Sequence, residues 1–247
     1  ELQFQSNAVP NRVRGQAAEA LVDFAPDGLE QAFFVNSGAE ANENALRLAF
    51  RRTGRPKVVA IEGGFHGRTA AAAAVSWRSE RWYGFPAKPF DVEFVPRGDF
   101  GMLEQAIDET TAALILEPVQ GLAGAYPLGR DYLDAAREAT ARAGALLIFD
   151  EVQCGLGRCG APFVARLHGV TPDILNFAKQ VTNGAQPLGG VIASKEIYDT
   201  FMAAGGPEYM LEFPHGYTYS AHPVACAAGI AALDILQKED MIGRVKA

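Results

Sequence analysis

Residues 145–179 read ALLIFDEVQCGLGRCGAPFVARLHGVTPDILNFAK, and this stretch decides the fold. Its two short apolar runs, at 145–149 and 173–178, are bounded by turn-forming residues and rich in branched side chains, which predicts two buried strands. Asp150 directly follows the first run and Lys179 directly follows the second. In a parallel sheet both residues would lie at the carboxyl ends of their strands, where open α/β sheets bind ligands. The sequence therefore predicts an acid and an amine at one crevice.

A lysine and an aspartate at one crevice are suited to a specific chemistry. A lysine at the edge of an apolar site can lose its proton and form a Schiff base with a carbonyl, and a buried aspartate can keep the ring nitrogen of a pyridine cofactor protonated. Pyridoxal phosphate needs both groups, and it needs a phosphate cradle as well. The alternative is that Asp150 and Lys179 are two solvated charges at strand ends.

The rest of the chain alternates between apolar runs and helical patterns. Together with the two runs above, the segments at 31–36, 57–62, 91–95, 112–117 and 189–194 make seven predicted strands. Helical spacing is found at 14–24, 40–52 and 131–143, and a further helix is expected to begin near Pro223. This alternation predicts an α/β fold with a mostly parallel seven-stranded sheet and helices on both faces.

Two turns that follow predicted strands are candidate cofactor contacts. After the strand at 31–36, Ser37, Gly38 and Ala39 lead into a helix, whose free N–H groups and positive dipole end would suit an anion. An ordinary helix cap at Asn36 or Ser37 explains the same residues equally well. After the strand at 57–62, a glycine-rich turn displays Phe65 and His66, and an aromatic ring there could stack on a flat ligand.

The composition is that of a folded domain without a nucleic-acid or membrane partner. The chain has 247 residues, 49% of them hydrophobic and 21% charged, which suffices for one sizeable domain or slightly more. The formal net charge is -7 and the basic residues form no stripe, so nucleic acid is a poor candidate partner. No apolar run approaches the ~20 residues of a membrane-spanning helix, and no signal-peptide pattern is present. We expect a cytoplasmic protein.

Other motifs are weaker. Three cysteines do not indicate a disulfide framework, and Cys154, Cys159 and His168 lack the spacing of a zinc site, so no metal is expected. GLGRCG at 155–160 matches a dinucleotide-binding fingerprint, but no helix starts within it and no acidic residue ends the next strand. A nicotinamide-dependent dehydrogenase is therefore disfavoured.

Six segments together resemble the class III, fold type I, pyridoxal-phosphate-dependent aminotransferases. They are NSGAEANE at 36–43, GGFHGRT at 63–69, LEPVQG at 116–121, FDEVQCGLGR at 149–158, FAKQVTNG at 177–184 and HGYTYSAHPVACAA at 215–228. They stand in the order of the family and cover essentially the whole chain. The resemblance implies the large domain of a fold type I PLP-transferase, with pyridoxal 5'-phosphate as cofactor.

The resemblance also implies roles for individual residues around the cofactor ring. Lys179 would bind the cofactor covalently and transfer protons between substrate and cofactor. Asp150 would pair with the ring nitrogen, and Gln153 would donate a hydrogen bond to the ring hydroxyl oxygen. The faces of the ring would be covered by Phe65 and Val152. His66 would lie alongside, and Glu117 matches a buried active-site glutamate of the family.

At the phosphate, the resemblance implies contributions from two subunits. Ser37, Gly38 and Ala39 would hold the phosphate through their backbone amides. Thr218 would reach the phosphate bound by a neighbouring subunit. A homodimer with shared active sites is thereby implied.

The implied reaction transfers an amino group from an ω-amino acid or amine donor to a 2-oxo acid, with pyruvate as the expected acceptor. The second half of the chain resembles β-alanine:pyruvate and other ω-amino acid:pyruvate aminotransferases, whereas 36–43 and 150–158 resemble the acetylornithine and ornithine type. Leu122 stands where ornithine-type members have a glutamate that gates a carboxylate-binding arginine, which favours the ω-amino donor. Cys159 replaces a common threonine, a departure that the sequence does not explain.

Alternatives remain at the sequence level. One is an acetylornithine or ornithine aminotransferase, another is a mutase, decarboxylase or racemase on the same fold, and a third is a catalytically incomplete fragment. We interpret residues 1–30 as a partial N-terminal segment, although FQSNA at 4–8 resembles a tag scar, and 31–247 as the PLP-binding large domain. The family's C-terminal small domain, with its carboxylate-binding arginine, is expected to be missing from the chain.

Overall fold

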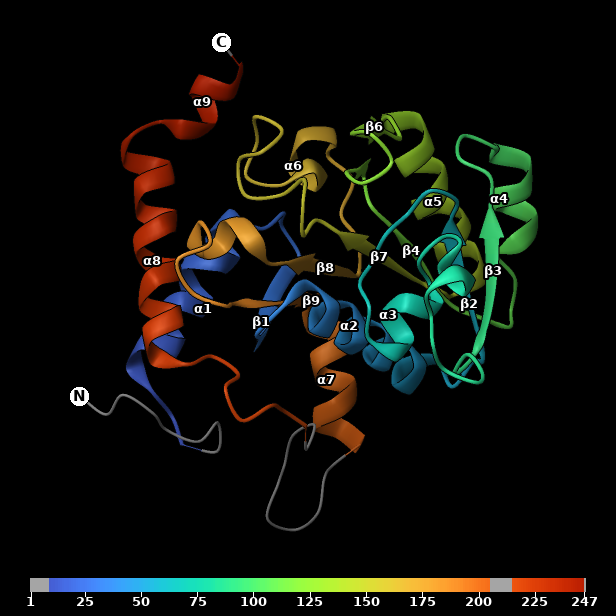
Figure 1. Ribbon diagram of the computed structural model, residues 1–247, viewed down its shortest axis with the longest axis horizontal. Helices are drawn as coiled ribbons and strands as arrows, with labels where there is room; N and C mark the ends of the chain where they lie inside the picture. Colours follow the sequence, from blue (N-terminus) through green and yellow to red (C-terminus); the bar gives the residue numbers. More distant parts are fainter. Residues whose placement is uncertain (1–8, 205–214, 247) are drawn as a thin grey trace.

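A seven-stranded sheet crosses the molecule in the computed structural model, which describes residues 9–204 and 215–246 (Figure 1). The strand order is β1-β9-β8-β7-β4-β2-β3. The strands are β1 (Leu29–Val35), β2 (Lys57–Ile61), β3 (Asp91–Val95), β4 (Thr111–Leu116), β7 (Leu146–Asp150), β8 (Ile174–Phe177) and β9 (Gly189–Ser194). They coincide with the predicted segments to within a few residues, so the seven-strand prediction is confirmed.

The sheet is mostly parallel, as predicted. Neighbouring strands from β3 through β2, β4 and β7 to β8 pair in parallel. Only β9 runs the other way, because it is antiparallel to both β8 and β1. A separate ribbon joins β5 (Val119–Gln120) to β6 (Tyr126–Pro127). This ribbon was not predicted, since two residues per strand are too few to produce a periodic pattern.

Helices cover both faces of the sheet. The predicted helices correspond to α1 (Arg12–Phe24), α2 (Gly38–Thr53), α5 (Arg130–Ala143) and α8 (Pro223–Lys238). Shorter helices that the periodicity did not predict are α3 (Ala70–Ala74), α4 (Phe100–Ala106), α6 (Val164–His168), α7 (Lys195–Ala204) and α9 (Met241–Lys246). Two 3-10 helices, η1 (Ser79–Arg81) and η2 (Lys179–Thr182), complete the described elements. None of the helices among the residues described is both long and apolar enough to cross a bilayer.

The core consists of two apolar layers, one on each face of the sheet. Strand β4 shows the division, because Leu114 and Leu116 belong to one layer while Ala113 and Ile115 belong to the other. The first layer includes buried residues of α1, α4, α5 and α8, and the second includes those of α2 and α7. Each fully buried leucine or isoleucine stabilises the fold by about 1.5–3 kcal/mol. The prediction of helices on both faces is therefore confirmed.

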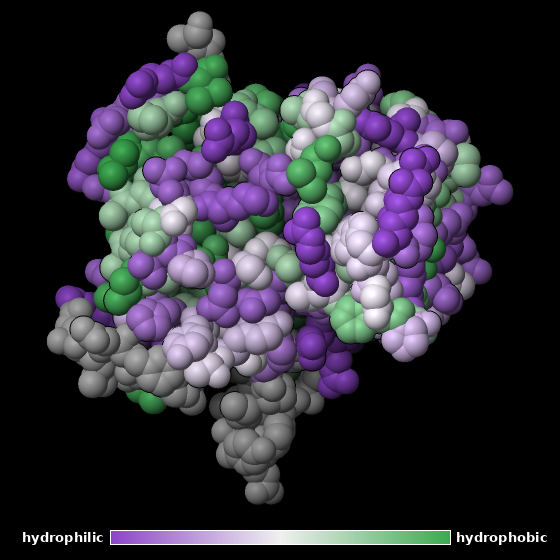
Figure 2. All heavy atoms as spheres, in the orientation of Figure 1, coloured by the Kyte–Doolittle hydropathy of each residue, from purple (hydrophilic) through white to green (hydrophobic). Residues whose placement is uncertain are grey.

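The outer surface of α8 remains apolar. Figure 2 shows hydrophobic residues gathered over α8 and α9 at the left of the view, among mostly hydrophilic neighbours. Val224 and Ile235 of α8 are among the exposed large hydrophobic residues. The buried side of the same helix contacts α1 and η2, so α8 connects the N-terminal helix to the segment that contains Lys179.

The strand ends at the expected crevice differ slightly from the prediction. Strand β7 includes Asp150 as its last residue, so this carboxylate is set by the sheet itself rather than by a following loop. Across the parallel pair, Asp150 is in register with Asn176 of β8. Strand β8 ends at Phe177, and Ala178 separates it from Lys179, the first residue of η2. Both candidate residues still lie at the same end of adjacent parallel strands.

Candidate active site

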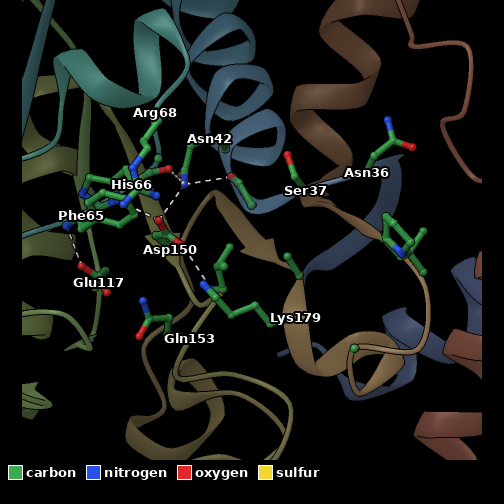
Figure 3. Close-up of a pocket in the computed structure, with 18 of the residues that line it drawn as sticks. Asn36, Ser37, Asn42, Phe65, His66, Arg68, Glu117, Asp150, Gln153 and Lys179 are labelled. Atoms are coloured by element: carbon green, nitrogen blue, oxygen red, sulfur yellow. Dashed lines mark hydrogen bonds and ion pairs between the residues drawn. The ribbon is translucent and has the colours of Figure 1, made fainter. Parts of the chain in front are cut away.

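A cavity of about 480 Å³ opens at the carboxyl ends of β7 and β8. It is lined by every candidate site residue but one, namely Ser37, Gly38, Ala39, Phe65, His66, Glu117, Asp150, Val152, Gln153 and Lys179. In Figure 3, Phe65, His66 and Glu117 lie on one side, Asn36 and Ser37 lie on the other, and Asp150, Gln153 and Lys179 lie between them. Asp150 and Lys179 therefore share one crevice.

Asp150 is a buried carboxylate whose oxygens are held by three donors. The side chain is 3% exposed. Its Oδ2 lies 2.7 Å from His66 Nδ1 and accepts a hydrogen bond of 2.7 Å from Asn42 Nδ2. Its Oδ1 accepts a bond of 3.1 Å from the backbone N–H of Val152. A carboxylate held in this way presents its remaining acceptor positions in a defined direction.

His66 is fixed by its backbone as well as by its ring. Its N–H donates to Ser76 Oγ at 2.8 Å, and its carbonyl accepts from Asn42 Nδ2 at 2.7 Å. A hydrogen bond from His66 to the Asp150 carboxylate requires the ring proton on Nδ1. His66 Nε2 is buried and has no hydrogen-bond partner among the residues that the structure describes. It is an orphaned polar atom beside the cavity.

The N-terminus of α2 forms the candidate phosphate cradle. Ser37 caps the helix, because its Oγ accepts from the N–H of Glu40 at 3.2 Å, and Glu40 Oε2 accepts in turn from the N–H of Asn36 at 2.7 Å. The alternative reading of Ser37 as a helix cap is thus correct for its hydroxyl. The N–H groups of Gly38 and Ala39, which precede Glu40 at the start of α2, have no partner within the helix and are available to an anion.

Gly38 is required for close packing at this cradle. A Cβ atom on Gly38 would lie 2.7 Å from Val152 Cγ1, closer than real side chains approach. Because Gly38 has no side chain, the end of α2 can approach Val152. Val152 lies two residues after Asp150, the last residue of β7. The glycine thereby brings the anion-binding end and the acidic end of the cavity together.

Glu117 connects the aromatic wall to the loop beside Gln153. Its Oε1 accepts from the N–H of Phe65 at 2.8 Å and its Oε2 accepts from the N–H of Gly121 at 3.1 Å. Burial raises the pKa of Glu117, against the opposing effect of His66. Gly121 leaves no room for a side chain, because a Cβ atom there would overlap Gln153 Oε1. Glu117 therefore holds the backbone of Phe65 and of Gly121, and Gly121 lies against the Gln153 side chain.

Lys179 occupies an unusual backbone conformation. Its φ is 44°, in the left-handed region that favours glycine, and it follows Ala178 at φ -165°. The conformation costs about 1–2 kcal/mol for a residue with a side chain. Strained non-glycine residues of this kind gather at functional sites. Lys179 is exposed, in contrast to the buried Asp150.

Thr218 is the candidate residue that the structure does not bring to this cavity. It is exposed in the turn that precedes α8 and is absent from the lining of the cavity.

Several lining residues were missed by the sequence analysis, among them Asn36, Asn42, Arg68 and Gln186. A signal for Asn42 was present, because it is a polar residue beside the apolar positions Ala41 and Ala45 of the buried face of α2.

Arg68 and Trp82 extend the aromatic wall around Phe65. The guanidinium of Arg68 lies 5.0 Å from the centroid of the Phe65 ring, and the ring of Trp82 lies 6.2 Å from it. A cation over an aromatic face is favourable and holds the ring in place. The Phe65 ring, which forms the wall next to Asp150, is thus contacted by both of these side chains.

The lining fits pyridoxal phosphate. The free N–H groups of α2 suit its phosphate, the oriented carboxylate of Asp150 suits its ring nitrogen, and Phe65 suits the face of its ring. The amine of Lys179 suits its aldehyde carbon. His66 Nε2 is a buried polar atom without a partner among the described residues, as expected beside a cavity that holds a polar ligand.

Comparison with known proteins gives consistent results. The profile of the family described as "Aminotransferase class-III" matches residues 1–247. The ω-amino acid–pyruvate aminotransferase of Pseudomonas putida is 39% identical, with 93% of this chain and 58% of that protein covered. The acetylornithine aminotransferase of Methanopyrus kandleri is 41% identical, with 96% of this chain and 58% of that protein covered.

Solved structures agree. An amine transaminase from an uncultivated Pseudomonas species, in its PLP-bound form, superposes with a TM-score of 0.91 at 32% identity, covering 98% of this chain and 61% of that one. A transaminase from the marine bacterium Virgibacillus gives a TM-score of 0.90 at 31% identity, covering 98% and 58%. The chain thus spans little more than half the length of the proteins it matches, at 58% of each curated relative above. Because the family profile matches the whole chain, the protein belongs to the class-III aminotransferases.

Proposed function

We propose that this chain binds pyridoxal 5'-phosphate at Lys179 and takes part in aminotransfer from an ω-amino acid or amine donor to a 2-oxo acid, with pyruvate as acceptor. The observation that carries the proposal is the shared cavity of Lys179 and Asp150, in which an amine stands near a carboxylate oriented by three donors. When bound, the cofactor supplies an electron-accepting ring.

The chain's own residues supply the remaining functions. Asp150 holds a proton at the ring nitrogen, and His66 and Asn42 orient Asp150 through Oδ2. Lys179 anchors the cofactor and moves a proton at its Nζ. Gln153 orients the ring hydroxyl. Phe65 and Val152 cover the two faces of the ring and exclude water from it, with Phe65 placed by Glu117.

The donor and acceptor are the finer part of the proposal. Relatives named ω-amino acid–pyruvate and acetylornithine aminotransferases are similarly close, at 39% and 41% identity. Leu122 favours the ω-amino donor, since an exposed apolar side chain at this position cannot hold an arginine by an ion pair. An acetylornithine or ornithine donor is the second candidate.

The proposal extends to assembly and organisation. Thr218 is exposed and away from the cavity of its own chain, as expected of a residue that serves a neighbouring subunit in a homodimer. We assign residues 31–247 to the cofactor-binding large domain and 1–30 to part of an N-terminal segment. We further infer a cytoplasmic location. Residues 1–8, with the FQSNA segment, lie outside the described part of the structure.

The cofactor step can be tested spectroscopically. Protein incubated with pyridoxal phosphate and freed of excess should absorb in the near-visible region, and borohydride should bleach this band and leave the cofactor's mass covalently on Lys179. Lys179→Ala should retain no covalent cofactor. Modification of another lysine, or covalent cofactor in the variant, would contradict the proposal.

The reaction class needs a separate assay. With β-alanine or an amine as donor and pyruvate as acceptor, one equivalent of alanine should form for each carbonyl product. Acetylornithine supplied with 2-oxoglutarate tests the second candidate in parallel. Loss of carbon dioxide or a rearranged donor without alanine would instead indicate a decarboxylase or mutase.

A further inference from the structure

We propose that Asn42 and Asn176 form a buried amide relay that orients Asp150, which makes Asn42 a positioning residue for the acid that faces the cofactor ring. The inference rests on the proposed function, because it concerns the same cavity. Asn42 lies on α2 and Asn176 on β8, and the two are 1% and 0% exposed.

The amide of Asn42 is surrounded by oxygen acceptors on its nitrogen side. Its Nδ2 lies 2.7 Å from Asp150 Oδ2, 2.7 Å from the carbonyl oxygen of His66 and 3.1 Å from that of Gly38. Figure 3 shows Asn42 joined by dashed lines to these partners. An amide has only two N–H groups, so these three acceptors share them.

Asn176 fixes which way this amide points. Its Nδ2 donates to Asn42 Oδ1 at 2.6 Å. A reversed Asn42 amide would set its oxygen against three oxygen atoms and its nitrogen against another N–H donor. The orientation is therefore determined on both sides, and the donor on Asp150 Oδ2 is held in place rather than free to rotate.

The relay connects the two ends of the cavity. Asn42 contacts the carbonyl of Gly38 at the phosphate cradle and the carboxylate of Asp150 at the ring end. Oδ2 is occupied by Asn42 and His66, and Oδ1 is bonded to Val152, which leaves Oδ1 with one further acceptor position. Loss of the Asn42 donor would leave Oδ2 to His66 alone and allow the carboxylate to turn.

Asn44 offers a matched control on the same helix. It is also 1% exposed, and its Nδ2 donates to the carbonyl of Glu40 at 2.7 Å and to Tyr217 Oη at 3.2 Å. It does not line the cavity, and these hydrogen bonds do not involve Asp150. An effect that comes only from losing a buried amide in α2 would therefore arise in both positions.

The first test compares cofactor affinity. In equilibrium dialysis of the full chain against pyridoxal phosphate, Asn42→Ala should bind about tenfold more weakly than the parent, the cost of one hydrogen bond to a charged group. The dissociation constant of Asn44→Ala for pyridoxal phosphate should stay within about twofold of that of the parent. Equal weakening by the two substitutions would reduce Asn42 to a structural role and overturn the inference.

The second test uses a signature that a structural role would not produce. Asn42→Asp places a second carboxyl group beside Asp150, and two such groups share one proton over a range of pH. The near-visible band of the bound cofactor should then gain a pH-dependent transition that the parent and Asn44→Asp lack. Identical titrations for all three proteins would refute the relay.

A milder variant covers the case in which the Asn42 substitutions prevent folding, which thermal melting will reveal. Asn176→Ala leaves every contact of Asp150 in place but removes the donor that holds Asn42 Oδ1 from the other side, so it should weaken cofactor binding in the same direction by a smaller factor. Unchanged affinity in a folded Asn176→Ala protein counts against the relay. If the parent itself takes up no cofactor, the proposed function fails and this inference fails with it.

Discussion

At the scale of single residues, the cavity depends on positions where a side chain is either missing or forced into a strained backbone. Gly38 and Lys179 are the clearest examples. Gly38 permits a close approach to Val152, and Lys179 adopts a left-handed conformation. These two features set the relative placement of the helix end, the carboxylate and the amine, which we expect the site to require.

Gly38→Ala should weaken cofactor binding although alanine is the better helix former. The added Cβ would meet Val152 Cγ1 at 2.7 Å, so the end of α2 must move away from Asp150. We expect about tenfold weaker binding of pyridoxal phosphate, measured by dialysis, because a shift of this size breaks short-range contacts. Val152→Ala is the reference background, because Val152 also covers a face of the ring: there the Gly38→Ala substitution should cost clearly less affinity than in the parent, since the clash is gone. An equal cost in both backgrounds would show that the contact is not the cause.

The strain at Lys179 can be measured with two variants that both lack the amine. Lys179→Gly should be more stable than Lys179→Ala by about 1 kcal/mol in cofactor-free protein, because glycine adopts φ 44° without steric cost. Elsewhere in a helical turn glycine would be the less stable of the two. Urea unfolding at equal pH gives the difference. An alanine variant of equal or greater stability would mean that the backbone at 179 is unstrained.

At the scale of elements, a buried carboxylate next to the site joins β7 to α6. Glu151 Oε2 accepts from the N–H of Val164 at 2.6 Å and Oε1 accepts from that of Ala165 at 2.8 Å. These are the first N–H groups of α6, a helix without a side-chain cap at Phe163. Glu151 therefore anchors the start of α6, at the end of the loop 151–163, to the end of β7 that carries Asp150.

The stability of the protein should depend on pH through Glu151. Burial raises its pKa from 4.5 to about 7, more than the two N–H groups lower it. Between these values the folded state holds a proton that the unfolded state has lost, so this group's contribution to the free energy of unfolding falls as pH rises and levels off above pH 7. From pH 5.5 to 8 the fall amounts to about 2 kcal/mol.

Glu151→Gln removes the titration and is the test of this dependence. Urea unfolding across that range gives the free energy of unfolding of the parent and of the variant. The difference, parent minus variant, should fall by about 2 kcal/mol from the low to the high end of the range. Glu138→Gln, at an exposed position of α5, should show no such trend relative to the parent. Parallel curves for the parent and Glu151→Gln would mean that the carboxyl is already ionised in the fold at pH 5.5.

At the scale of the whole molecule, the proposed homodimer makes Thr218 and Lys179 belong to different chains of one site. Thr218→Ala and Lys179→Ala dimers should each have little transaminase activity, for separate reasons. If subunits are exchanged between them, a hybrid dimer contains one site with both native residues, and up to about a quarter of all sites should regain activity. Sedimentation measures whether each protein is a dimer, which the exchange requires. Mixed variants that stay inactive, while exchange is demonstrated, would argue against shared sites.

Much of the fold could be predicted because it depends on local patterns. The seven strands and four long helices each produce a period or an apolar run that the chain shows directly. The β5–β6 ribbon and short helices such as α3 were missed, since AAAAA at Ala70–Ala74 has no alternation that distinguishes a helix from a buried loop. Short elements are held by their surroundings rather than by their own sequence.

The sequence by itself determined the α/β class, the candidate acid and amine at strand ends, and the six motifs that resemble the family. Only the tertiary structure decided which residues meet. Asn42 contacts Asp150 across 108 positions of the chain, and Asn176 reaches Asn42 across 134. The same holds for the exclusion of Thr218 from the cavity of its own chain. The physical reason is that secondary structure follows from neighbours along the chain, whereas a hydrogen-bonded site exists only after helices and strands pack and bring distant polar groups within about 3 Å of each other.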